Sequence, residues 1–140
     1  ILGEGELRAE FEELVADLGL KDVVDLPGFD ANPYAYFKYA SLFVLSSNWE
    51  GLPGVLIQAL ASKVKVVSTN CPSGPMEILE NSKFGLLVEC NDQAGLTQAM
   101  QQAIFADYVQ YQEADFEAHI QQFHKQTVLK QYLRMMESAA

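Results

Sequence analysis

A glutamate that precedes a short turn and a helix start is the part of the sequence best suited to chemistry. Pro53 suits the first position of a helix, so the backbone N–H groups of residues 54–56 are predicted to be free at the positive end of the helix dipole. Such an end attracts a phosphate group. The sequence therefore places a carboxylate and an anion site together, on Glu50, Gly51, Leu52, Pro53, Gly54 and Val55.

Gln58 follows Gly54 by one helical turn and lies on the same face of the predicted helix. Because Gly54 has no side chain and helical side chains lean toward the N-terminus, the Gln58 amide is open to a ligand at the helix start. We therefore predict that Glu50 and Gln58 hold one ligand. The competing interpretations are a solvated carboxylate, stabilised by about 0.3–1 kcal/mol near a helix N-terminus, and a polar helix residue that faces water.

The composition excludes several other classes of function. Nine basic and nineteen acidic residues give the 140-residue chain a net charge of −10, which repels nucleic acid and anionic lipid. No apolar run reaches the length of a membrane span. Cys71 and Cys90 lack metal-ligand spacing, so we expect reduced thiols and no metal site. The chain starts at Ile1 without a methionine, and we expect it to be a fragment.

Apolar runs of strand length alternate with helical stretches, which favours an α/β fold with parallel β/α units. We predict four complete strands after a strand that ends near Leu2: Val23–Leu26, Leu42–Leu45, Lys65–Ser68 and Gly85–Val88. Glu50 then lies just beyond the carboxyl end of a strand, the edge where open α/β sheets bind ligands.

Helical spacing of apolar residues predicts helices over residues 6–18, ended by Gly19, over 32–40 and over 93–105. Residues 107–140 contain no strand pattern and are predicted to form one or two helices. We therefore divide the chain into an α/β domain over residues 1–106 and a helical segment over 107–140 that packs on it. An uncovered face of this helical segment would favour self-association.

Two further turns are candidates for ligand contact. Gly3 and Gly5 lie between a strand end and a helix, where backbone can approach a nucleotide, although a tight turn explains them equally well. Ser73 and Gly74 precede a helix in which Pro75 is the first residue, and a purely structural cap explains that pattern as well as a ligand does. The two histidines lie far from these motifs, and we do not expect them to be catalytic.

The stretch from Glu50 to Leu60 resembles the signature of retaining glycosyltransferases of family 4, which have the glycosyltransferase-B fold. That signature is a Glu, seven residues and a second Glu, and Gln58 stands here in place of the second Glu. The resemblance extends over residues 27–29, 41–47 and 66–78 and covers residues 1–106 in order. It implies a Rossmann-like parallel sheet with helices on both faces, forming the second, donor-binding domain of the enzyme.

The resemblance also implies roles for individual residues. Glu50 would hold hydroxyls of the donor sugar, the amides of residues 51–55 would approach the sugar and the distal phosphate, and Gln58 would contact the ribose. The turn that contains Phe29 and Asp30 would contact the base through its backbone. Family members usually supply an Arg and a Lys for the donor diphosphate upstream of the matched region, so we expect this chain alone to bind the donor weakly and to catalyse nothing.

The implied reaction transfers a sugar from a UDP- or GDP-linked donor, without a metal, to a glycan or lipid-linked acceptor, with retention of configuration. The acceptor would bind a missing first domain, and the protein would be cytoplasmic or peripheral at the inner face of the cell membrane. Two alternatives stay open: a non-catalytic nucleotide-sugar-binding module, which Gln58 makes conceivable, and a nucleotide-sugar epimerase of the same fold. A dehydrogenase is disfavoured because Gly3-Glu4-Gly5 lacks the third glycine of its fingerprint.

Overall fold

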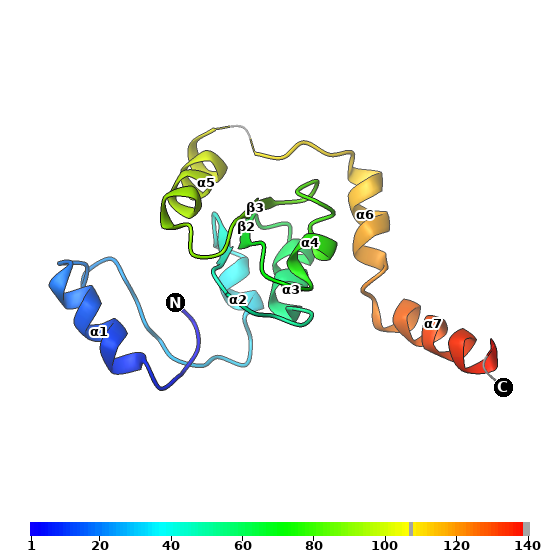
Figure 1. Cartoon of the computed structure of the whole chain (residues 1–140), viewed down its shortest axis with the longest axis horizontal. Coiled ribbons are helices and arrows are strands. Elements are labelled where there is room, and N and C mark those ends of the chain that lie inside the picture. The colour runs from blue at the N-terminus through cyan, green and yellow to red at the C-terminus, as the bar shows by residue number, and fades with distance from the viewer. Residues whose placement is uncertain (107, 139–140) are drawn as a thin grey trace. The chain divides into compact units, whose positions relative to one another are not determined.

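A computed structural model describes residues 1–106 and 108–138, which form two units (Figure 1). The first unit comprises Ile1–Ala35 and the second Tyr36–Ala140. Helix α2, Tyr34–Phe37, crosses the boundary between them. The predicted domain boundary between residues 106 and 107 lies partly outside the described residues.

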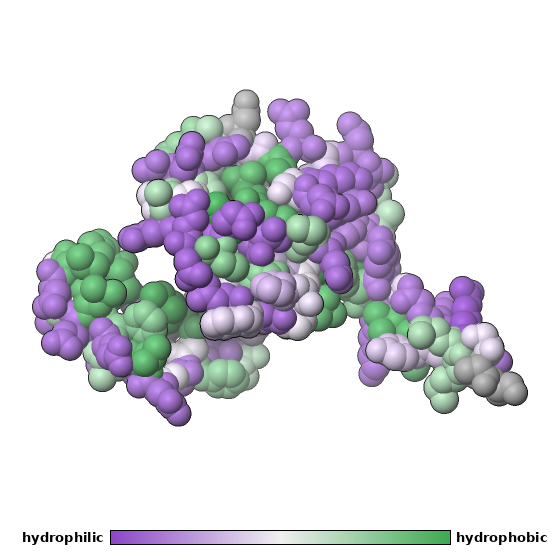
Figure 2. All heavy atoms as spheres, viewed as in Figure 1, coloured by the Kyte–Doolittle hydropathy of each residue, from purple (hydrophilic) through white to green (hydrophobic). Residues whose placement is uncertain are grey.

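The first unit contains helix α1, Arg8–Asp17, flanked by extended segments. One parallel bridge joins Leu2 to Gly28, where the Gly3 N–H donates to the Gly28 carbonyl at 2.9 Å. Gly19, predicted to end the helix, adopts the left-handed conformation with φ of 67°, which glycine accommodates without strain. Figure 2 shows hydrophobic groups on the surface over α1, and the exposed side chains there are Leu7, Phe11, Leu14 and Leu18.

The predicted strand over Val23–Leu26 is wrong. The backbone N–H groups of Val23 and Val24 both donate to the Leu20 carbonyl, so this segment begins as a continuation of turns after α1. The Val23 side chain is 75% exposed. An apolar run becomes a strand only where a neighbouring strand accepts its ladder of hydrogen bonds, and the one bridge of this unit lies at Gly28 instead.

The second unit is built on a parallel sheet of three strands in the order β1-β2-β3. They are β1, Phe43–Leu45, β2, Val66–Thr69, and β3, Leu86–Val88. In the register of the sheet, Leu45 pairs with Ser68, and Thr69 pairs with Val88. Three of the four predicted complete strands are therefore confirmed, each with a shift of at most one residue at either end.

Helices cover both faces of this sheet (Figure 1), as predicted. Successive residues of a strand point to opposite faces, so Val66 and Val67 on β2 mark the two cores. Val66 packs in a cluster with side chains of α3, Gly54–Ala61, α4, Pro75–Ile78, and α6, Glu113–Gln121. Val67 packs against α5, Gln93–Phe105, whose bounds are those predicted from the sequence.

The segment after α5 forms two helices, as the sequence allows, and Tyr108 and His119 are among the residues that attach it to the sheet and α4. The Tyr108 hydroxyl accepts from the Val66 N–H at 2.6 Å and donates to the Val66 carbonyl at 2.8 Å. His119 of α6 is buried, stacks on Phe84, and donates through Nε2 to the Ile78 carbonyl at 2.7 Å. Helix α7, Lys125–Ser138, buries none of its residues.

The described helices include none that combines the length and the apolar character needed to cross a bilayer.

Candidate functional site

Two loops at the carboxyl edge of the sheet form the core of the candidate site. The first, residues 46–53, joins β1 to α3 and contains Glu50, and the second, residues 70–74, joins β2 to α4. Glu50 is half-buried. This is the position in an open parallel sheet where ligands bind.

The Glu50 carboxylate is fixed by a hydrogen bond within its own loop. The Ser47 hydroxyl donates to Glu50 Oε1 at 2.8 Å. The Ser47 carbonyl in turn lies 2.5 Å from the hydroxyl oxygen of Thr69, which is the last residue of β2 and is buried. Neither hydroxyl was predicted from the sequence to belong to the site. The only signal for Ser47 is its position three residues before Glu50, and Thr69 becomes visible only once the sheet register is known.

The start of α3 differs from the prediction by one residue. Pro53 is the N-cap, with ψ of 96°, and the helix begins at Gly54. The Leu56 N–H, predicted to be free, donates to the Pro53 carbonyl at 3.0 Å. In the described part of the chain, no backbone acceptor lies within hydrogen-bond reach of the N–H groups of Gly54 and Val55. The positive end of the dipole therefore presents two amides, not three, beside the exposed Gly51 and Leu52.

The two loops touch at Gly74. Its φ is 86°, and a Cβ placed on it would lie 2.5 Å from Pro53 Cδ and 2.6 Å from the Gly51 carbonyl oxygen. Only glycine fits a left-handed position with such close neighbours. Gly74 also caps α4 with Pro75 as its first residue, as predicted. Exposed Ser73 shares the left-handed conformation, with φ of 68°.

Gln58 is half-buried in the second turn of α3. Its backbone carbonyl accepts from Ser62, and within the described residues its side-chain amide makes no hydrogen bond. The amide is therefore available to a ligand. Nearby, burial raises the pKa of the Cys71 thiol, and the neighbouring Cys90 and Glu50 raise it further.

The remaining predicted contacts lie in the first unit. The bridge at Gly28 brings Gly3 beside the segment that holds Phe29, whose side chain is 77% exposed. Asp30 accepts from the Asn32 N–H at 2.8 Å and so closes its own turn. Gly5 has open space where a side chain would begin.

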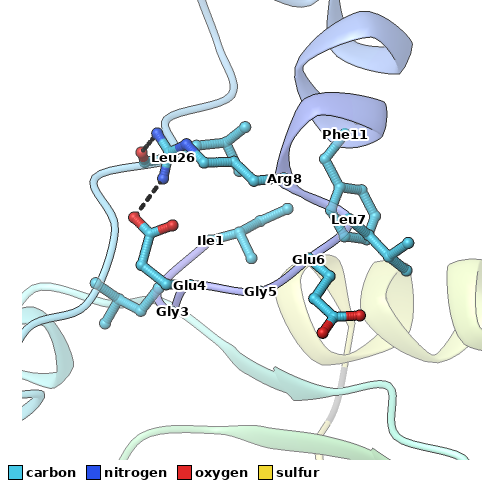
Figure 3. Close-up of a pocket in the computed structure, with 10 residues that line it drawn as sticks. Ile1, Gly3, Glu4, Gly5, Glu6, Leu7, Arg8, Phe11 and Leu26 are labelled. Atoms are coloured by element: carbon cyan, nitrogen blue, oxygen red, sulfur yellow. Dashed lines mark hydrogen bonds and ion pairs between the residues drawn. The ribbon is translucent and has the colours of Figure 1, made fainter.

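A cavity of about 480 Å³ adjoins the Gly3–Gly5 segment (Figure 3). Leu7 and Phe11 extend from α1 on one side of it, and Arg8 reaches across to the Leu26 carbonyl at 2.8 Å. Arg8 also pairs with the carboxylates of Glu4 and Glu12, at 2.6 and 2.8 Å. Its pKa is raised, chiefly by the hydrogen bond to Glu12. Two carboxylates therefore partner the charge of Arg8 in this structure.

No cluster of three or more His, Cys, Asp or Glu side chains suited to a metal occurs in the described residues. The expected independence from a metal stays a prediction. The polar groups offered by the site are one carboxylate, one amide side chain and the two backbone amides at the α3 start.

The sequence pattern of the glycosyl transferases group 1 matches residues 1–134. The chain is 41% identical over 100 residues to the N-acetylgalactosamine-N,N'-diacetylbacillosaminyl-diphospho-undecaprenol 4-alpha-N-acetylgalactosaminyltransferase of Campylobacter jejuni. This match covers 71% of the chain and 27% of the relative. The chain spans between 20% and 41% of the length of the first three curated relatives that it matches.

Solved structures have the same fold. The apo form of the lipopolysaccharide outer core galactosyltransferase WaaB matches all of the chain over 40% of its own length, with a TM-score of 0.84 and 21% identity. A variant of TarM from S. aureus, in complex with fondaparinux, alpha-GlcNAc-glycerol and UDP, matches 96% of the chain over 28% of its own length. Its TM-score is 0.83 and its identity 25%. With the glycosyltransferase-B fold confirmed and the family pattern spanning residues 1–134, this chain belongs to the group 1 glycosyl transferases.

Proposed function

We propose that this chain forms the donor-binding part of a retaining glycosyltransferase of family 4. One observation carries the proposal. Glu50 lies in a loop where Ser47 holds its carboxylate by a hydrogen bond, directly before the free amides of Gly54 and Val55 at the start of α3. A carboxylate binds sugar hydroxyls, and helix-end amides bind phosphate. The donor that fits this pair of groups is a nucleotide-diphosphate sugar.

The leaving diphosphate gains negative charge as the sugar departs. The amides of Gly54 and Val55 stabilise this charge without rearrangement because the helix already orients them. Glu50 holds hydroxyls of the sugar, and the Gln58 amide contacts the ribose. Ser73 at the second loop is a further proposed donor contact of this unit. For the first unit, taken by itself, we propose that Gly3, Gly5, Phe29 and Asp30 contact a nucleotide.

The donor is UDP- or GDP-linked, and no metal takes part. The UDP in the TarM complex supports a UDP-linked donor by similarity. The undecaprenol-linked glycan in the name of the Campylobacter relative supports a lipid-linked acceptor in the same way. The acceptor is a glycan or a lipid-linked glycan, and it binds a part of the enzyme outside this sequence. This chain by itself binds the donor and does not transfer the sugar. The intact enzyme is cytoplasmic or lies at the inner face of the membrane.

A non-catalytic nucleotide-sugar-binding module is the second candidate, because Gln58 stands where a charged residue would bind the ribose more strongly. Hydrogen bonds to a charged group contribute about 1.5–3 kcal/mol, against about 0.5–1.5 kcal/mol for a neutral one. Failure of the intact wild-type protein to transfer or hydrolyse any nucleotide sugar, with binding retained, would favour this candidate.

Glu50→Gln in the intact enzyme tests the proposal. The change keeps the shape of the side chain and removes its charge, so the transfer rate should fall about a hundredfold or more while the melting temperature stays nearly constant. Glu117→Gln, the same change on the exposed face of α6, is the matched control and should leave the transfer rate unchanged. The anomeric configuration of the product, read by NMR, tests retention. Near wild-type transfer by the Glu50→Gln enzyme would exclude Glu50 from the mechanism.

A further inference from the structure

We propose that Ser47 and Thr69 are positioning residues that hold the Glu50 carboxylate in place for the reaction. This inference rests on the proposed function of Glu50. It adds two hydroxyl groups, one on the loop and one on the sheet, which act through Glu50 and do not touch the substrate.

The loop that carries Glu50 gives the first reason for such support. Residues 46–53 contain no helix or strand, so no regular hydrogen-bond ladder fixes the carboxylate. The hydrogen bond from the Ser47 hydroxyl to Glu50 Oε1, at 2.8 Å, spans three residues of this loop. Charge-assisted bonds of this kind are about twice as strong as neutral ones. One carboxylate oxygen is therefore held, while Oε2 has no hydrogen-bond partner within the described residues and is available to a sugar hydroxyl.

Thr69 ties this loop to the sheet. It is the last residue of β2, the central strand, and is only 4% exposed. Its hydroxyl oxygen lies 2.5 Å from the Ser47 carbonyl and 3.3 Å from the Leu45 carbonyl, so its single proton goes to the nearer acceptor, the Ser47 carbonyl. A buried hydroxyl needs such a partner. The Cys90 thiol, in the loop after β3, is 3.9 Å from the same Ser47 carbonyl.

Thr69 and Ser47 thus connect the central strand to Glu50 through two hydrogen bonds. The other end of the loop is held separately, because the backbone at Gly74 packs against Gly51 and Pro53. A loop held at both ends places the carboxylate with little freedom, and small displacements of a catalytic group are costly to rate.

The test is a double-mutant cycle in the intact enzyme, with Ser47→Ala and Thr69→Val each made alone and together with Glu50→Gln. Ser47→Ala should lower kcat about ten- to a hundredfold, with a smaller change in donor KM. In the Glu50→Gln background the same change should alter kcat less than about threefold, since residues that act as one unit are not additive. Thr69→Val should behave in the same way, and Thr69→Ser, which keeps the hydroxyl, should restore most of the activity.

Thr97→Val, which removes a hydroxyl from the exposed face of α5, is the matched control and should leave kcat unchanged. Melting temperatures separate a folding defect in Thr69→Val from a kinetic one, and Ser47→Ala and Thr69→Ser test the inference even if Thr69→Val does not fold. Wild-type kcat in Ser47→Ala, or an equal loss with and without the Glu50 carboxylate, would overturn the positioning role alone. An active Glu50→Gln enzyme would overturn the proposed function itself.

Discussion

The two units of this chain differ in how they bury their apolar side chains. In the second unit, every residue of the central strand β2 is buried, and Val66 and Val67, on opposite faces of the sheet, are fully buried. In the first unit, α1 buries no residue, and its side chains Phe11 and Leu14 are 48% and 51% exposed. Glu50 belongs to the packed unit, and the Gly3–Gly5 segment belongs to the other.

This difference bears on what each unit can contribute to a site. Regions with few buried apolar contacts open at lower free energy than packed cores. The groups that need a fixed geometry, Glu50 and the α3 amides, are attached to the packed sheet. In the first unit, a Cβ placed on Gly3 or Gly5 would have nothing within 4 Å, so the surroundings of this segment are open.

Phe84→Ala should show the largest effect. Phe84 is 1% exposed and packs against the rings of Tyr111, Phe116 and His119. Its truncation leaves a cavity that costs about 3–5 kcal/mol of the free energy of unfolding, measured in urea. Leu14→Ala on α1 is the comparison and should cost less than about 1 kcal/mol. Equal losses for the two variants would mean that the α1 face is packed in solution.

Tyr108 should make stability fall at alkaline pH. Burial raises its pKa from 10.0 to about 12. Between about pH 10 and 12 the folded state therefore keeps the phenol proton while the unfolded state has lost it. The contribution of Tyr108 to the free energy of unfolding is complete below pH 10 and is lost over this range. A shift of two units corresponds to about 2.7 kcal/mol. Tyr108→Phe removes the hydroxyl and should flatten the unfolding free energy over this pH range, and an unchanged slope would rule out Tyr108 as its source.

Gly74→Ala should destabilise the contact between the two loops. The new methyl group meets Pro53 and Gly51 and forces a left-handed φ on alanine, at a cost of about 1–3 kcal/mol. Gly54→Ala is a matched change in the same region, where a Cβ finds nothing within 4 Å, and should not lower stability. Chemical denaturation of the two variants gives the comparison, and a neutral Gly74→Ala would show that the loops separate easily.

Gln58→Glu should show the smallest effect. A carboxylate at this half-buried position accepts from ribose hydroxyls more strongly than an amide does, so nucleotide affinity should increase by about 1 kcal/mol. Because the amide makes no hydrogen bond in the described part of the protein, the melting temperature should stay nearly constant. Calorimetric titration with UDP and GDP measures the change, and an unaltered affinity for both would remove the proposed ribose contact.

The fold of the second unit follows closely from local sequence pattern. The apolar runs of β1, β2 and β3 and the spacing of α5 are strong signals because each element buries a face of its own. The same reasoning gave a wrong strand at Val23–Leu26. Its Val-Val run has the pattern of a strand, but no neighbouring strand pairs with it. Whether an apolar run pairs with another strand depends on residues far away in the sequence, and the periodicity of the run itself contains no information about them.

The geometry of the candidate site was predictable where its residues form one continuous stretch. Glu50, the turn after it and Gln58 lie within nine residues, and the position of Gly74 as a helix cap follows from Pro75. The hydrogen bond from Thr69 to Ser47 joins residues 22 apart in sequence and depends on the pairing of β1 with β2. The hydrogen bond of the Leu56 N–H was not predicted, because the first turn of a helix can form a bond to a carbonyl three residues earlier, here that of Pro53.

The most direct test of the central claim, that the donor binds at the Glu50 loop, is nucleotide titration followed by amide NMR shifts. Millimolar UDP or GDP should first perturb the amides of Gly51, Gly54, Val55 and Gln58, with smaller changes in the first unit. Inorganic sulfate at the same ionic strength is the control for general anion binding. Shifts confined to residues after 108, or an unperturbed α3 start in the presence of both nucleotides, would contradict the account.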